Sequence, residues 1–341
     1  MDYSRFSTVL VVFLMTQLSV SAVADVVAYD WRLTSIMTAF DGVLLETLGI
    51  NDKPSNEAVI DIALGQEIEE MDGMSGITQC VIEPNSTAVY RYAPDKAGTF
   101  WWHSHHKTQY SFGLRGPLIV RAPENELRAV EKEIDSEYII QLTDIYHAQP
   151  PPGPVLWDTI AINNLGRFDC TAATINNLTE CDPDQPLSSF GFQEGKKYLL
   201  RVTNMAAMAP FEFSIDGHDF QVIAADAEPV MPSQLINSIT INIGQRYDII
   251  VEAKKDTQEA SSFWVRAKGL TGLPWITRTG NTGSAGFNDE GLAIIRYDST
   301  STAEPTSQPH EDTVTVGEFD FTPKAKIYFG NEDLARSPVV C

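Results

Sequence analysis

Short runs in which hydrophobic and polar side chains alternate make up most of this chain. In residues 197–204 the alternation places Tyr198, Leu200 and Val202 on one face, which is typical of a strand with one buried face. Turn-forming residues separate such runs, and no long run has the periodicity of a helix. The other runs that we expect to be strands are residues 26–33, 58–63, 87–92, 137–147, 213–218, 244–251, 262–267 and 314–316. The pattern predicts an all-β protein built from Greek-key β-sandwiches.

The first 24 residues have the layout of a secretory signal. Arg5 is followed by an apolar run over residues 9–20 and then by Ala22, Val23 and Ala24, which form a small-residue cleavage site. The apolar run is shorter than a membrane-spanning helix, and no later segment approaches that length. We therefore expect residues 1–24 to be removed and the protein to be soluble, secreted and extracellular, with no membrane span.

Composition and charge narrow the set of partners. Hydrophobic residues make up 43% of the chain, as in a globular protein, and its length corresponds to about two domains of ordinary size. The formal net charge is −22, so nucleic acid and anionic membranes would repel the protein. We expect neither to be a partner.

The candidate chemistry lies in residues 98–116, which read GTFWWHSHHKTQYSFGLRG. If the strand continues through the histidines, His103 and His105 point the same way about 6.5 Å apart, while His106 falls on the opposite face. Two such imidazoles form a two-pronged metal ligand, although an isolated H-x-H is often a pair of ordinary histidines. A zinc-hydrolase H-x-H-x-D motif would need an acid at position 107, where this chain has Lys107.

Residues 98–116 resemble the second copper motif of multicopper oxidases, the family of laccases, ascorbate oxidases and ferroxidases. The family pattern G-T-[FY]-[WFY]-[WY]-H-S-H-x-x-x-Q-x-x-x-G-L-x-G is matched nearly position by position. LTDIYH at 142–147, FSIDGH at 213–218 and GQRYDIIV at 244–251 are similar to signatures of the family's second domain. The resemblance implies tandem cupredoxin-like domains, copper as cofactor, and dioxygen and a small reducing substrate as partners. It also implies that His103 and His105 are type 3 copper ligands, one imidazole to each ion.

Other family motifs are missing from the sequence. The expected strand at 59–69 is followed by Glu70 and then directly by MDG at 71–73, without the first copper motif, H-W-H-G, and neither H-P-x-H-x-H nor H-C-H occurs. An internal deletion fits this pattern, and the sequence leaves open whether an isoform or a sequence error caused it. We expect an incomplete first cupredoxin domain at 25–125, a second domain at 130–298, and a linker with the truncated start of a third at 299–341.

The missing motifs limit the activity that the resemblance implies. A complete relative couples one-electron oxidation of phenolic or similar substrates to the reduction of dioxygen to water, using four coppers. This chain keeps ligands for part of the type 3 pair only, so we expect it to be inactive alone. The alternative is a non-catalytic secreted cupredoxin-fold module that binds copper or a protein partner. The reducing substrate and the oligomeric state stay open, and loss of a core strand predicts a distorted first domain.

Cysteines and sequons agree with export. Cys170 and Cys181 bracket a short polar loop and are candidates for a disulfide, and GRFDC at 166–170 resembles the family stretch that carries such a bond. Cys80 resembles a family cysteine whose partner lies in the third domain, so pairing with Cys341 and two free thiols both remain open. The sequons predict glycosylation at Asn85 and Asn177.

Three further histidines are interpreted as structural or exposed. His147 and His218 have no partner histidine at ligand spacing. His310 lies in the polar, proline-bearing segment 299–312, which reads as a linker, and we expect its side chain to be solvated.

Overall fold

The computed structural model describes residues 27–64, 79–90, 93–148, 156–178, 180–254, 261–272, 284–317, 320–321 and 323. The predicted signal at 1–24, the junction at 69–71 and Cys341 lie outside these residues. Among the described residues, no helix is long and apolar enough to cross a membrane. The few helical turns are η1 (Ser55–Glu57), η2 (Glu124–Glu126), η3 (Glu131–Glu133) and η4 (Cys170–Ala172).

Two sheets form the second domain. One contains β7 (Ser136–Ile145), β8 (Thr159–Ile162), β9 (Leu165–Gly166), β11 (Lys197–Asn204), β13 (Phe220–Ala225), β14 (Glu228–Pro229) and β16 (Arg246–Glu252), in the order β14-β13-β16-β11-β7-β8-β9. The other contains β10 (Ser189–Gly191), β12 (Phe211–Ile215), β15 (Ser238–Ile241), β17 (Ser262–Gly269) and β18 (Glu290–Arg296), in the order β10-β18-β17-β12-β15. This is the predicted all-β sandwich.

The alternating pattern of β11 explains how the sandwich closes. β11 pairs in parallel with β7 and antiparallel with β16. Its side chains Tyr198, Leu200 and Val202 enter the main cluster of buried hydrophobic residues, where side chains from the facing sheet, such as Phe213, meet them. Leu199, on the other face, packs in a smaller cluster with Ile223 and Ile250. β11 therefore lies in the middle of its sheet and is buried on both faces.

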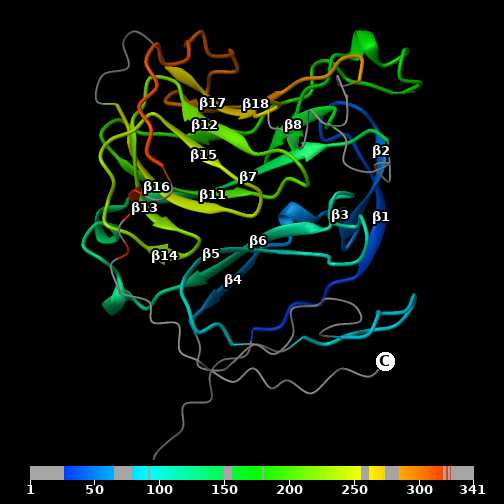
Figure 1. Cartoon of the computed structure of the whole chain (residues 1–341), viewed down its shortest axis with the longest axis horizontal. Coiled ribbons are helices and arrows are strands. Elements are labelled where there is room, and N and C mark those ends of the chain that lie inside the picture. The colour runs from blue at the N-terminus through cyan, green and yellow to red at the C-terminus, as the bar shows by residue number, and fades with distance from the viewer. Residues whose placement is uncertain are drawn as a thin grey trace, which may run out of the picture.

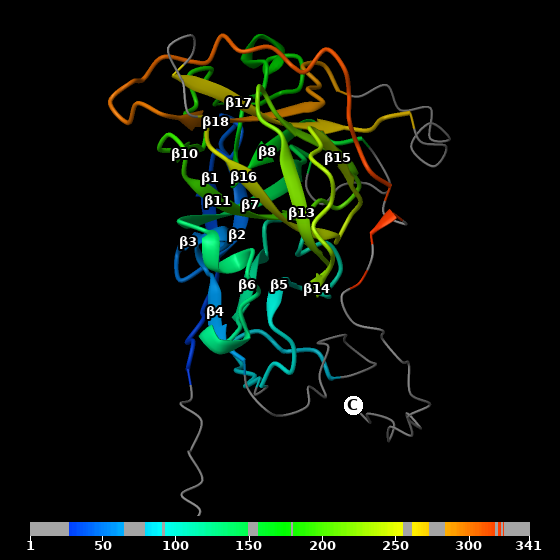
Figure 2. The ribbon, with the colours of Figure 1, turned by 90° about the vertical axis from the view of Figure 1, so that its left-hand side faces the viewer.

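The first domain consists of two small sheets. One has the order β1-β2-β3 and contains β1 (Leu33–Thr38), β2 (Leu45–Ile50) and β3 (Lys53–Pro54). The other has the order β4-β6-β5 and contains β4 (Ile60–Ala63), β5 (Gly98–His103) and β6 (Arg115–Arg121). In Figure 1 and Figure 2, β4, β5 and β6 lie together on one side of the sandwich, below its sheets.

The first domain lacks a well-covered core in the described part of the chain. Val43 is the only one of its residues that enters the three clusters of buried hydrophobic side chains formed by described residues. Large hydrophobic side chains are instead exposed at Val27, Tyr29, Leu33, Met37, Val81, Ile82, Val89 and Tyr90. Such exposure is expected where a sandwich lacks a strand that would cover its face.

Two predicted strands of this domain are wrong. The strand predicted at 26–33 begins only at Leu33, and its described residues before Leu33 are not in a strand. The described residues of the run at 87–92 form no strand and are exposed, with Val89 70% exposed. An alternating run becomes a strand only where a neighbouring strand takes its backbone hydrogen bonds.

The first domain is fastened to the second through β5. The Thr99 hydroxyl donates to a carboxylate oxygen of Asp248 on β16. Arg246, on the same strand as Asp248, donates from Nε to the backbone oxygen of Thr99 at 3.0 Å. Arg201 on β11 donates to the hydroxyl oxygen of Thr99, also at 3.0 Å. The strand that leads to His103 is therefore anchored on the second domain at its beginning.

Residues of the segment predicted to be a linker, 299–312, form hydrogen bonds with the second domain. The Ser307 hydroxyl donates to Asp216 at 2.8 Å, and Nε2 of His310 lies 3.0 Å from the backbone oxygen of Ile215. Asn237 donates from its backbone to Val314 and accepts from the Val314 backbone N–H at 2.8 Å. Residues 314–316 form no strand. The predictions of a solvated His310 and of a strand at 314–316 are both wrong: the His310 ring contacts the backbone of Ile215, and Val314 bonds to Asn237 instead of to a strand.

Candidate metal centre

The histidine motif lies at the end of a hairpin. β5 pairs antiparallel with β6, from Gly98 opposite Val120 to His103 opposite Arg115. Beyond His103 the chain leaves the sheet, and the Ser104 N–H donates to the Leu114 carbonyl at 3.1 Å to close the loop. The strand therefore ends at His103, and the expectation of a strand running through both histidines is wrong.

The two predicted ligands nevertheless lie side by side. The rings of His103 and His105 have centroids 4.5 Å apart and planes inclined by 37°. Nδ1 of His103 lies 3.1 Å from the carbonyl oxygen of Ser104. A carbonyl oxygen can only accept, so this contact places the proton on Nδ1, and Nε2 is then the ring nitrogen that can act as a metal donor.

His106 follows in the loop and belongs to a different set of contacts. Its backbone N–H donates to the Ser104 hydroxyl oxygen at 3.1 Å. That hydroxyl donates to the side-chain oxygen of Gln109 at 2.6 Å, and the Gln109 N–H donates to the His106 carbonyl at 3.1 Å. Ser104 thus fixes the shape of the loop. Since the strand has ended, the predicted opposite strand face for His106 does not exist.

Aromatic rings surround His103. Trp101 stacks on it with centroids 4.3 Å apart and planes inclined by 26°. Tyr110 lies 5.3 Å from the His103 centroid and 6.0 Å from that of Trp101. Burial and the negative charge of Asp144 raise the pKa of Tyr110 above its ordinary value, against the effect of Arg115. Its hydroxyl therefore stays protonated and acts as a hydrogen-bond donor.

The histidine pair fits copper as a partial ligand set. Imidazole nitrogen is a good copper donor, and the Nδ1 contact of His103 is the kind of support that fixes a ligand's tautomer. In the described part of the chain, no group of three or more His, Cys, Asp or Glu side chains is arranged to hold a metal ion. The pair therefore supplies two donors, and a complete site needs further ligands.

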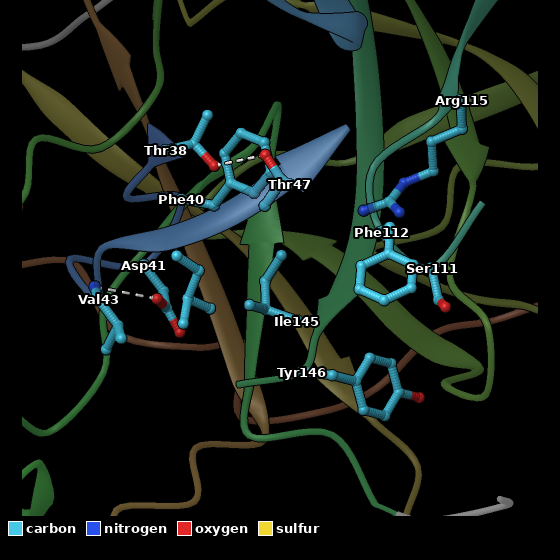
Figure 3. Close-up of a pocket in the computed structure, with 11 residues that line it drawn as sticks. Thr38, Phe40, Asp41, Val43, Thr47, Ser111, Phe112, Arg115, Ile145 and Tyr146 are labelled. Atoms are coloured by element: carbon cyan, nitrogen blue, oxygen red, sulfur yellow. Dashed lines mark hydrogen bonds between the residues drawn. The ribbon is translucent and has the colours of Figure 1, made fainter. Parts of the chain in front are cut away.

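A small pocket lies beside the motif, between the two domains. It has a volume of about 10 Å³, close to the space that one water molecule needs, and Figure 3 shows the side chains that surround it. Ser111, Phe112 and Arg115 come from the hairpin, while Ile145 and Tyr146 come from the second domain. Arg115 is only 3% exposed, and its Nε has no hydrogen-bond partner. A more open groove of about 510 Å³ lies next to it, lined in part by Gln109 and His147.

His147 has a partner that the sequence pattern did not reveal. Its Nε2 lies 2.7 Å from a carboxylate oxygen of Asp41 in the first domain, and its Nδ1 lies 3.9 Å from Asp158. Thr159 also donates to Asp41. Asp41 and His147 are 106 positions apart in the chain, so no local motif signals the pair. The structural interpretation of His147 agrees with this buried ion pair.

The remaining predicted sites lie away from the histidines. Cys170 and Cys181 form a disulfide with Cα atoms 5.6 Å apart. Cys80 is also disulfide-bonded, so the alternative of a free thiol at this position is wrong, and pairing with Cys341 stays open because Cys341 lies outside the described residues. Asn85 and Asn177 are exposed and have positive φ angles of 61° and 56°, a conformation common in turns. Both side chains are open to solvent, as glycosylation requires.

Comparison with known proteins bears on both the fold and the histidine motif. The structure resembles that of Fet3p, a multicopper oxidase that functions in iron import, with a TM-score of 0.69 and 20% identity over 89% of this chain and 58% of that one. It also resembles the laccase from Botrytis aclada, with a TM-score of 0.66 and 29% identity over 83% of this chain and 54% of that one. The architecture is therefore that of cupredoxin-like domains in tandem, the first of them incomplete.

Sequence comparison gives the family. Models described as multicopper oxidase match residues 57–125 and 136–300. Dihydrogeodin oxidase of Aspergillus terreus is 34% identical over 71% of this chain and 38% of its own length. Laccase-5 of Trametes villosa is 35% identical over 74% of this chain and 44% of its own length. The chain belongs to the multicopper oxidase family and is laccase-like. It spans about two fifths of the length of these curated relatives.

Proposed function

We propose that this chain is the copper-binding part of a laccase-type oxidase, with His103 and His105 each holding one ion of a type 3 copper pair. When bound, copper supplies the one-electron redox chemistry that couples oxidation of a phenol or similar small reductant to reduction of dioxygen to water. The role of the chain's own residues is to bind and orient. His103 offers Nε2 because Ser104 holds its Nδ1 proton, and Trp101 fixes the plane of the ring.

The observation that carries the proposal is the side-by-side arrangement of the two imidazoles, with ring centroids 4.5 Å apart. Both histidines belong to one hairpin, and this hairpin lies within residues 57–125, the region matched by a multicopper oxidase model. Two imidazoles whose rings lie side by side suit two adjacent copper ions. A pair of ordinary surface histidines would not need the fixed tautomer at His103.

We further propose that the chain by itself does not turn over substrate. Two imidazoles without a cysteine thiolate cannot make a blue copper site or complete a three-copper cluster. The described residues contain no group of three or more side chains that could hold a metal, and this observation favours the second candidate function, a non-catalytic module that binds copper or a protein partner. The two candidates differ in whether further ligands complete the site in the working protein.

The test is copper content per chain of the purified protein, with an absorption spectrum and a phenol-oxidation assay on the same sample. We expect weak binding of copper, no blue band and no turnover. His103→Ala and His105→Ala should each reduce copper binding, whereas His106→Ala, the matched control in the same loop, should leave it unchanged. Several tightly bound coppers with a blue band would refute the ligand count, and unchanged binding in both alanine variants would refute the assignment of the site.

Export and glycosylation belong to the same proposal. The layout of residues 1–24 and the exposed sequons support a secreted glycoprotein, and the net charge of −22 supports a protein that avoids nucleic acid. Expression of the full chain in a eukaryotic host tests both points. We expect secretion, and a loss of mass on endoglycosidase treatment that Asn85→Gln and Asn177→Gln together abolish. Retention in cells, or a mass that the enzyme does not change, would contradict it.

A further inference from the structure

The second domain carries no predicted copper ligand, yet it contacts the aromatic rings that surround His103. We propose that Tyr110 and Trp101 are positioning residues through which the second domain sets the orientation of the His103 ring. This inference rests on the proposed function of the histidine pair as a copper ligand. It assigns a role to two side chains that do not themselves donate to the metal.

Tyr110 joins the histidine loop to the second domain by one hydrogen bond. Its hydroxyl donates to the carbonyl oxygen of Ala206, 96 positions further along the chain. Its own carbonyl accepts from Nη1 of Arg115 at 2.7 Å, so the residue is held from both ends. The ring between these two bonds lies 5.3 Å from the His103 ring. Movement of the Ala206 carbonyl would therefore move the Tyr110 ring, which lies beside the His103 ring.

The Ala206 carbonyl is itself rigidly held. The turn that contains it connects β11 to β12, and the buried carboxylate of Asp144 accepts from the backbone N–H groups of Ala207 at 2.8 Å and Met208 at 2.7 Å. Asn204 accepts from the Ala206 N–H at 2.8 Å. A carboxylate that accepts several backbone N–H bonds in a buried site is a strong constraint on a turn. The anchor for Tyr110 is thus a turn held by several buried hydrogen bonds.

Trp101 lies beside a second turn of that domain. One part of its ring system stacks on His103, and its Cζ2 atom lies 3.8 Å from where a Cβ would stand on Gly244. Gly244 has φ of +79° and belongs to the turn between β15 and β16, a conformation that glycine adopts without strain. Its N–H donates to the backbone oxygen of Asn204 at 2.9 Å. Asn204 therefore bonds to both turns, the one that holds Tyr110 and the one beside Trp101.

The arrangement explains why the ring of His103 has a defined plane although its strand ends at that residue. The Ser104 contact fixes the tautomer, but it does not by itself fix the tilt of the ring. Stacking on Trp101 and contact with Tyr110 limit that tilt from two sides, since ring contacts prefer definite geometries. Supporting side chains of this kind hold metal ligands in place, and their loss lowers metal affinity about 10- to 100-fold.

The experiment compares Tyr110→Phe and Trp101→Phe with the wild type and with Tyr138→Phe as the matched control. Tyr138 likewise donates its hydroxyl to a backbone carbonyl, that of Gly191, at 2.8 Å, but in the second domain. One readout is the NMR chemical shift of the His103 ring in metal-free protein, at a pH where the imidazole is neutral. The other is Cu²⁺ affinity measured by competition with a chelator of known strength, with the thermal unfolding midpoint recorded for each variant.

We expect Tyr110→Phe to move the His103 ring signals and to weaken Cu²⁺ binding about tenfold, while Tyr138→Phe changes neither. Unchanged ring signals and unchanged affinity in both Tyr110→Phe and Trp101→Phe would overturn the inference. If the wild type binds no copper but the ring signals still move, the proposed function fails and the positioning role stands. If Tyr110→Phe does not fold, Trp101→Phe tests the same inference by the same two readouts. We expect this variant to fold, because phenylalanine keeps an aromatic ring at position 101.

Discussion

Replacing Asp41 by Asn tests how the two domains are held together beside the histidine motif. Asp41 lies in the first domain and is 1% exposed. It binds three groups: His147 at 2.7 Å, the Thr159 hydroxyl, and the Val43 N–H at 3.2 Å. The asparagine side chain has nearly the same size but no charge, and one end of its amide is a donor. At least one of the three donors therefore loses its acceptor.

The expected loss follows from burial. The side chains of Asp41 and His147 are 1% and 5% exposed, so solvent does not screen the pair. Removing one partner of such a pair costs about 3–5 kcal/mol, because the other is left buried without compensation. Asparagine keeps the volume and part of the hydrogen bonding, so we expect the free energy of unfolding to fall by about 3 kcal/mol at pH 6.

The loss should also depend on pH. Burial lowers the pKa of His147, but the hydrogen bond and charge of Asp41 and the charge of Asp158 outweigh it, so the net shift is upward from 6.5. A histidine whose pKa is raised on folding contributes stability that is complete below its unfolded pKa. The contribution disappears as the pH rises through the raised value. The substitution should therefore cost more at pH 6 than at pH 9.

The assay is urea unfolding followed by tryptophan fluorescence at both pH values. Asp52→Asn is the control, because Asp52 pairs with Arg32 at the surface, where the side chains are 63% and 68% exposed, and should cost less than about 1 kcal/mol. A loss below about 1 kcal/mol at pH 6 for Asp41→Asn, or equal losses at pH 6 and pH 9, would show that His147 and Asp41 do not form a charged pair in solution.

Three further predictions follow from other contacts. Replacing Cys170 and Cys181 together by Ser opens a loop with a sequence separation of 11 and should lower the free energy of unfolding by about 3 kcal/mol; no loss in urea titration would contradict this. Gly98→Ala would place a Cβ 2.5 Å from a side chain of the second domain and should cost about 1–3 kcal/mol, whereas Gly272→Ala, with nothing within 4 Å, should be nearly neutral in thermal unfolding. Burial lowers the pKa of His218 to about 4. The wild type should therefore lose about 3 kcal/mol as the pH falls from 6.5 to 4, and an equal loss in His218→Gln would refute this account.

Local alternation was a good guide to the strands of the second domain. The prediction of a strand at 197–204 is confirmed with the same bounds, and the strand predicted at 137–147 lies at Ser136–Ile145. In the turn after β8, Asn163 and Asn164 adopt positive φ angles, a conformation that asparagine tolerates. These features depend on backbone geometry and on which side of a strand each residue faces, and both repeat over a few residues.

Residues 87–90 show where the local pattern fails. They alternate as clearly as β11, but they form no strand because no neighbouring strand in the described structure pairs with them. His310 fails for a related reason: its segment is polar throughout, yet Ile215 offers a backbone oxygen to its ring. Composition describes a segment's own preference for water, and it contains nothing about the surface that the segment meets.

The sequence by itself determined the all-β class, the family resemblance and the two neighbouring histidines, because each depends on residues close together in the chain. Only the tertiary structure decided where β5 ends, which partner Asp41 finds and how the second domain contacts Tyr110. Those contacts join positions 106 and 96 residues apart. They are set by how two sheets pack and by which buried polar groups must find partners, and no short motif contains that information.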